Sequence, residues 1–80
     1  MKYPFDSSSI YAIRVAGRLD KSWADRLGGL AIDCVEKDEN DQSITTLKGC
    51  LPDQAALLGV LNTLYNLNYP LLFVRYLRSS

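Results

Sequence analysis

The chain has 80 residues, 48% of them hydrophobic, with nine basic residues balanced by nine acidic ones and no histidine. This length predicts one domain, and the formal net charge of zero gives no general electrostatic attraction to nucleic acid or to an anionic membrane. Because histidine is the commonest acid–base catalyst near neutral pH, its absence argues against many classes of enzyme.

Residues 1–9 are predicted to form a flexible N-terminal arm, since Pro4, Asp6 and the serines at 7–9 oppose regular structure. No apolar segment typical of a targeting peptide follows this arm, and the most apolar stretch is too interrupted to span a bilayer. We therefore expect a single α+β domain over residues 10–78, located in the cytoplasm and without a membrane partner.

The first predicted strand covers residues 10–16, where bulky apolar residues occupy the odd positions. The phrase Gly17-Arg18-Leu19-Asp20 ends this strand, and Asp20 can cap a short helix over residues 21–27. Gly28-Gly29 then ends the helix, because glycine adopts a left-handed conformation at little cost.

A hairpin is predicted next, with strands over residues 30–37 and 44–49 joined by a polar turn. The turn lacks the ligand spacing and central glycine of a calcium loop, so no metal site is expected. Pairing Val35 with Ile44 places both side chains on one face of the sheet. In that register Cys34 and Cys50 lie too far apart for a disulfide, and we expect two free thiols.

The clearest helix pattern lies between residues 53 and 67. It follows Gly49-Cys50-Leu51-Pro52-Asp53, which resembles the phrase before the first helix and supplies Asp53 to the helix N-terminus. Asn68 and Pro70 are expected to end it. An apolar stripe at helical spacing is formed by Leu57, Val60, Leu61, Leu64 and Leu67.

The order strand–helix–strand–strand–helix–strand is typical of a ferredoxin-like βαββαβ sandwich, with a short first helix and a four-stranded, mainly antiparallel sheet. Only about a dozen residues separate the first two strands, which is near the minimum for a crossover connection. The alternative is an antiparallel meander with one main helix.

The final predicted strand, residues 71–77, is apolar on both faces. Its residues Leu72, Val74 and Tyr76 are expected to face the helices, which leaves an apolar surface on the opposite face of the sheet. An exposed apolar surface of this kind usually binds something, and a second copy of the chain is the expected cover. The candidate interface residues are Leu71, Phe73, Leu77, Val35 and Ile44.

Trp23, Arg14 and Arg75 are candidate anchors for a ligand or a partner, since tryptophan and arginine are common in binding hot spots. Alternatively, Trp23 covers the hydrophobic core, and the two arginines are simply solvated at the surface. The third strand lacks the aromatic residues on which RNA-recognition motifs stack bases, so no nucleic-acid partner is expected. No catalytic residue is predicted, because Asp20 and Asp53 are explained as helix caps and no histidine can activate a cysteine.

Three segments of the chain form a pattern: Val15-Ala16-Gly17-Arg18-Leu19-Asp20 with Trp23 and Gly29-Leu30, TxLxGxLxDQAALxGxL ending at Leu61, and PLLxV beginning at Pro70. This pattern resembles a family of small uncharacterised bacterial proteins without an established activity. The phrase Gly17-x-Leu19-Asp20 after a strand is also similar to the opening of STAS domains, which regulate by docking to proteins.

The expected function is a non-enzymatic protein–protein interaction or regulatory module, homodimeric through the sheet face or bound to another protein. A small-ligand-binding sensor is the alternative. A cofactor-independent enzyme built on a dimeric sheet is a third possibility. No cofactor is expected for any of these roles.

Overall fold

The computed structural model describes residues 8–24 and 27–79. Its elements follow the predicted order: β1 (Ser9–Ala16), α1 (Lys21–Ala24), β2 (Leu30–Lys37), β3 (Ser43–Leu51), α2 (Gln54–Asn66) and β4 (Leu71–Ser79). Most of the predicted N-terminal arm lies outside the described residues, and Ser9, its last residue, already belongs to β1. The second half of the predicted first helix includes residues 25 and 26, which also lie outside the description.

The four strands form one antiparallel sheet in the order β2-β3-β1-β4. β1 lies in the interior of the sheet, where it pairs with β3 on one side and with β4 on the other. In a meander β1 would instead pair with β2, its neighbour in the sequence. The sheet and the helices together confirm the α+β class.

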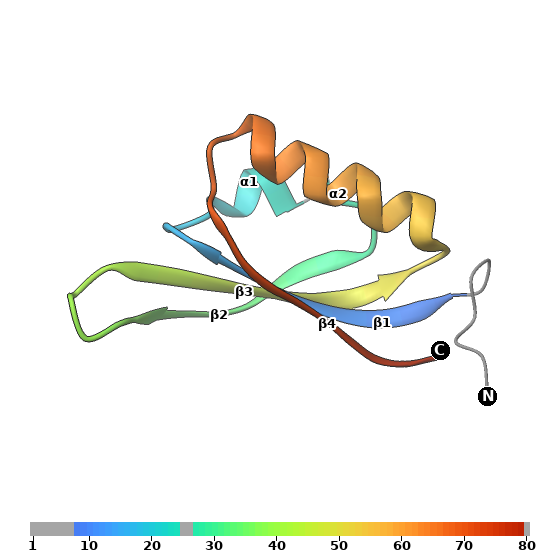
Figure 1. Cartoon of the computed structure of the whole chain (residues 1–80), viewed down its shortest axis with the longest axis horizontal. Coiled ribbons are helices and arrows are strands. Elements are labelled where there is room, and N and C mark those ends of the chain that lie inside the picture. Colours follow the sequence, from blue (N-terminus) through green and yellow to red (C-terminus); the bar gives the residue numbers. More distant parts are fainter. Residues whose placement is uncertain (1–7, 25–26, 80) are drawn as a thin grey trace.

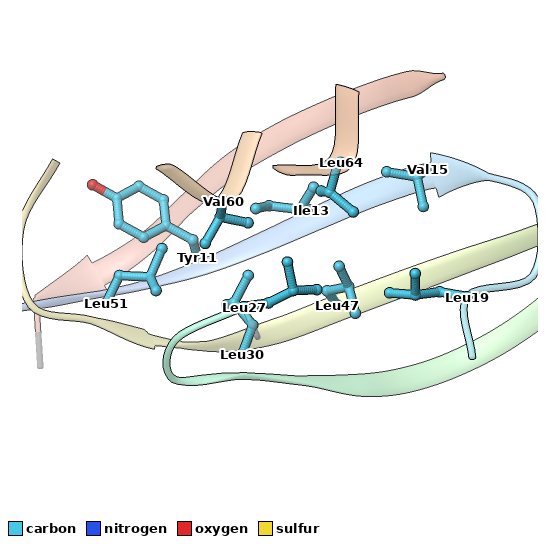
Figure 2. Close-up of a cluster of buried hydrophobic side chains, with 10 residues drawn as sticks. All are labelled: Tyr11, Ile13, Val15, Leu19, Leu27, Leu30, Leu47, Leu51, Val60 and Leu64. Carbon is cyan, nitrogen blue, oxygen red and sulfur yellow. The ribbon is translucent and has the colours of Figure 1, made fainter. Parts of the chain in front are cut away.

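Both helices lie on one side of the sheet, so the molecule has two layers (Figure 1). The buried hydrophobic side chains between the layers come from β1, β2, β3, α2 and the loops around α1 (Figure 2). Residues 11, 13 and 15 of β1 face this core, which is the alternation that the sequence predicted. The described core consists of Tyr11, Ile13, Val15, Leu19, Leu27, Leu30, Leu47, Leu51, Val60 and Leu64.

The boundaries of α2 follow from the residues at its ends. Asp53 is the N-cap, and its carboxylate accepts a hydrogen bond of 2.8 Å from the backbone N–H of Ala56. Asn68 adopts the left-handed conformation with φ of 65°, as predicted for the residue that ends the helix. The backbone N–H of Tyr69 then donates to the carbonyl of Leu64, which closes the last turn.

A register shift in β2 corrects the predicted pairing of Val35 with Ile44. Ile32 lies opposite Leu47, in the register that this predicted pair implies, but Asp33 is an extra residue in the strand, and Val35 lies opposite Thr45. One extra residue moves the following side chains to the other face of a strand. Because Thr45 is buried on the helix side, Val35 also lies on the helix side and not on the open face with Ile44.

Cys34 and Cys50 are free thiols, as predicted. Within the described ranges, no helix is long and apolar enough to cross a membrane.

Candidate interaction surface

β4 is an edge strand and the most exposed element of the sheet. Every one of its residues is exposed except Tyr76, and five of them are large hydrophobic residues. The ten residues of the described core include none from β4, and only Tyr76 packs against that core. These five side chains are 36–49% exposed: Leu71, Leu72, Phe73, Val74 and Leu77.

Two register shifts divide β4. Between them, residues 73–76 keep a continuous antiparallel register with residues 11–14 of β1. Tyr76 lies opposite Tyr11, and their rings meet edge to face at 5.8 Å. Outside this segment Leu72 and Leu77 are the extra residues at the two shifts. The regular part of the edge is therefore short and centred between Val74 and Arg75.

On the open face of the sheet, Arg14 joins residues of all four strands. Its guanidinium lies 5.4 Å from the centre of the Phe73 ring in β4 and 2.9 Å from a carboxylate oxygen of Glu36 in β2. Its Nε donates to Thr46 in β3 at 3.3 Å, and the same Glu36 oxygen accepts from the thiol of Cys34. Arg14 is thus already bound within the chain, which lowers its capacity to anchor an outside partner.

The rest of the open face is mixed in character. Ala12 lies between Arg75 of β4 and Lys48 of β3 in one row, and Ile10 lies between Arg78 and Cys50 in the next. Charged and small residues therefore lie between the apolar side chains of this face. The largest concentration of exposed apolar side chains is at the β4 edge instead.

The predicted interface residues separate into three groups. Phe73 lies opposite Arg14 and Ile44 lies opposite Ala16, so both occupy the open face as predicted. Leu71 lies opposite the buried Val15, because the extra residue Leu72 reverses the expected alternation, and it therefore belongs to the helix side. Val35, which lies opposite Thr45, is on the helix side as well. Leu77 lies at the second register shift, where it has no assigned partner in β1.

Two hollows adjoin these residues. One, of about 520 Å³, lies at the β4 edge and is lined by Arg14, Phe73, Val74 and Arg75. It brings the two predicted arginine anchors to the same place, beside an aromatic ring and an exposed aliphatic side chain. This arrangement can accept a flat or cationic group that stacks on Phe73.

The second hollow, of about 600 Å³, lies between the loop after β1 and the helix-side face of β2. Its lining combines two cations and one carboxylate with apolar side chains: Arg18, Leu19, Asp20, Lys21, Ile32 and Val35. Trp23 belongs to α1 beside this hollow, but its side chain lies outside the described residues, so its predicted role as an anchor has no structural account.

Sequence analysis did not identify Thr45, whose fully buried hydroxyl fixes the loop beside this second hollow. The hydroxyl donates to the carbonyl of Gly17 at 2.7 Å and accepts from the backbone N–H of Leu19 at 3.1 Å. Tyr69 also holds this loop, because its hydroxyl donates a hydrogen bond of 3.2 Å to the carbonyl of Arg18. The sequence does carry a signal for this role, because a threonine at a strand position that faces the core needs a hydrogen-bond partner for its hydroxyl.

No group of three or more potential metal ligands occurs among the described side chains. Neither the curated proteins nor the solved structures compared with this chain include a match. One family model matches residues 10–75, which covers β1 to the middle of β4. The chain therefore belongs to the family described as a domain of unknown function, DUF8691.

Proposed function

We propose that this chain is a non-enzymatic interaction module that forms a homodimer, with a regulatory role exerted through binding. The observation that carries this proposal is the β4 edge, where five large hydrophobic side chains are exposed on one strand. Natural sheets usually protect an edge strand with charge, with proline or by keeping it short. β4 has nine residues and only two charges, Arg75 and Arg78.

The finer description of the fold belongs to the same proposal. We propose a ferredoxin-like sandwich, since the chain has two strand–helix–strand halves joined by the β2–β3 hairpin. Both helices cover one face of the sheet, which leaves the other face and two edges for binding (Figure 1). A non-enzymatic role is supported by the absence of histidine from the whole sequence.

The test is the solution mass by light scattering over a range of concentrations. Wild type is expected to be a dimer, and Val74→Glu is expected to be a folded monomer, because a carboxylate would be buried at an apolar contact. Leu58→Glu is the matched control, since Leu58 is 62% exposed on α2. A wild type that stays monomeric at millimolar concentration would refute the homodimer.

A small-ligand sensor is the second candidate, and the hollow of about 600 Å³ beside α1 favours it. Arg18 and Lys21 line it with Ile32, so an anionic ligand with an apolar part would match its chemistry. Trp23 is the chain's only tryptophan, and its fluorescence can be followed against a panel of phosphates and carboxylates. A saturable change in Trp23 fluorescence that Arg18→Ala abolishes would support the sensor. Fluorescence that does not change with any compound of the panel would refute it.

A further inference from the structure

We propose that two copies of this chain pair edge to edge through β4, antiparallel, with Val74 at the two-fold axis and Phe73 opposite Arg75 of the second copy. This inference rests on the homodimer proposed above and specifies its geometry. The two four-stranded sheets would then form one continuous sheet of eight strands. The proposal differs from an interface between the open faces of two sheets, which the sequence alone predicted.

The choice of edge follows from the two ends of the sheet. Register shifts interrupt both edge strands, one in β2 and two in β4, so the character of the side chains decides between them. β2 carries Asp33, Glu36 and Lys37, and charges on an edge strand oppose pairing with another chain. β4 carries no acidic residue and exposes five large hydrophobic side chains.

Symmetry restricts the register. A two-fold axis perpendicular to the sheet keeps each side chain on its own face, so a residue can lie opposite only residues an even number of positions away. The regular segment 73–76 has its midpoint between Val74 and Arg75. The axis must therefore pass through one of these two residues if the pairing is to use the whole segment.

Charge decides between the two registers. An axis at Arg75 would place Arg75 directly against Arg75 of the second copy, and like charges in that position are destabilising. An axis at Val74 avoids this contact and gives Val74 against Val74 and Phe73 against Arg75 within the regular segment.

The register centred on Val74 also fills the hollow at the edge. It brings Arg75 of the second copy opposite Phe73, beside the hollow of about 520 Å³ that Arg14, Phe73, Val74 and Arg75 line. One guanidinium, that of Arg14, already lies against the Phe73 ring, and its charge is balanced by Glu36. An aromatic ring has two faces, so it can accept a second guanidinium. Symmetry forms this contact twice in the dimer.

Cysteine cross-linking reads the register directly. In a Cys34→Ser, Cys50→Ser background, Val74→Cys is expected to form a disulfide-linked dimer under mild oxidation, because opposite residues in antiparallel strands have Cα atoms about 4.5–5.5 Å apart. Arg75→Cys is the matched control. In the same register each Arg75 lies one position from the axis, so the two copies are offset by two positions in total. This separates their Cα atoms by roughly 8 Å and prevents a bond.

A charge series at Phe73 tests the same register without a cross-link. Phe73→Arg would set two arginines opposite each other at both symmetric contacts, and the dimer dissociation constant is expected to rise about tenfold or more. Phe73→Glu would set a carboxylate opposite Arg75, and the dissociation constant is expected to stay within about threefold of wild type. Circular dichroism confirms that each variant is folded.

The outcomes separate this inference from the homodimer itself. Cross-linking at Arg75 but not at Val74, or equal effects of Phe73→Arg and Phe73→Glu, would overturn the register. A wild-type dimer that cross-links at neither position would overturn edge pairing while leaving the homodimer intact. A wild type that is monomeric by light scattering would refute both proposals.

Discussion

At the scale of the residue, Thr45 shows how one buried hydroxyl holds the loop between β1 and α1. Its two hydrogen bonds hold Gly17 and Leu19 in place beside the hollow near α1. Thr45→Val keeps the shape of the side chain but leaves the buried N–H of Leu19 and the partly buried carbonyl of Gly17 without this partner. We expect the free energy of unfolding to fall by about 1–3 kcal/mol, measured by urea denaturation.

The control for this prediction is Thr45→Ser, which keeps the hydroxyl and removes one methyl group. We expect it to be more stable than Thr45→Val, with a loss of about 1 kcal/mol from the missing methyl. If Thr45→Val instead matched wild type while Thr45→Ser lost stability, the position would be important for its packing and not for its hydrogen bonds.

Arg14 shows which part of the candidate site the sequence could not predict. Strand periodicity correctly placed it on the open face, away from Tyr11, Ile13 and Val15. Its contacts with Glu36 and Phe73 join β1 to the two strands at opposite edges of the sheet. Such contacts depend on the strand order and register, which no local pattern encodes.

At the scale of the element, Gly49 in β3 and Gly59 in α2 differ in the space available for a side chain. Gly49 of β3 lies opposite Leu30, and a methyl group on it would overlap the backbone carbonyl of Gly29. Gly59 of α2 has only open space around the same position. The two positions therefore predict opposite results for the same substitution.

Gly49→Ala is expected to lower the free energy of unfolding by more than about 2 kcal/mol, because backbone in both strands must move apart. Gly59→Ala is expected to raise it by about 0.5–1 kcal/mol, since alanine is a better helix former than glycine in an exposed position. Thermal unfolding followed by circular dichroism compares the two. A neutral Gly49→Ala would show that the hairpin can separate freely at this point.

The sequence predicted the elements far better than their faces. Helix caps are local, so Asp53 and Asn68 marked the ends of α2 correctly. The strand faces failed at Val35 and Leu71, because one extra residue in β2 and one in β4 reversed the alternation. A bulge depends on how two strands fit each other, so the sequence of one strand does not predict it.

At the scale of the whole molecule, the two edges of the sheet differ in what they can bind. β2 ends the sheet with two acidic side chains, whereas β4 ends it with five exposed large hydrophobic side chains and no acidic residue. Association through β4 would bury the most exposed apolar strand and leave the charged edge in water. Stability should then depend on protein concentration, because association stabilises the folded state by mass action.

Hydrogen exchange measures this difference strand by strand. If β4 pairs with a second copy, its outward backbone N–H groups gain partners, and their exchange is expected to slow about tenfold or more when the protein concentration is raised above the dimer dissociation constant. The amides of β2 provide the internal control, since the same change in concentration should leave them almost unaffected. Exchange that slows in β2 instead would place the contact at the opposite edge. Exchange that is independent of concentration in both strands would mean that neither edge pairs with a second copy.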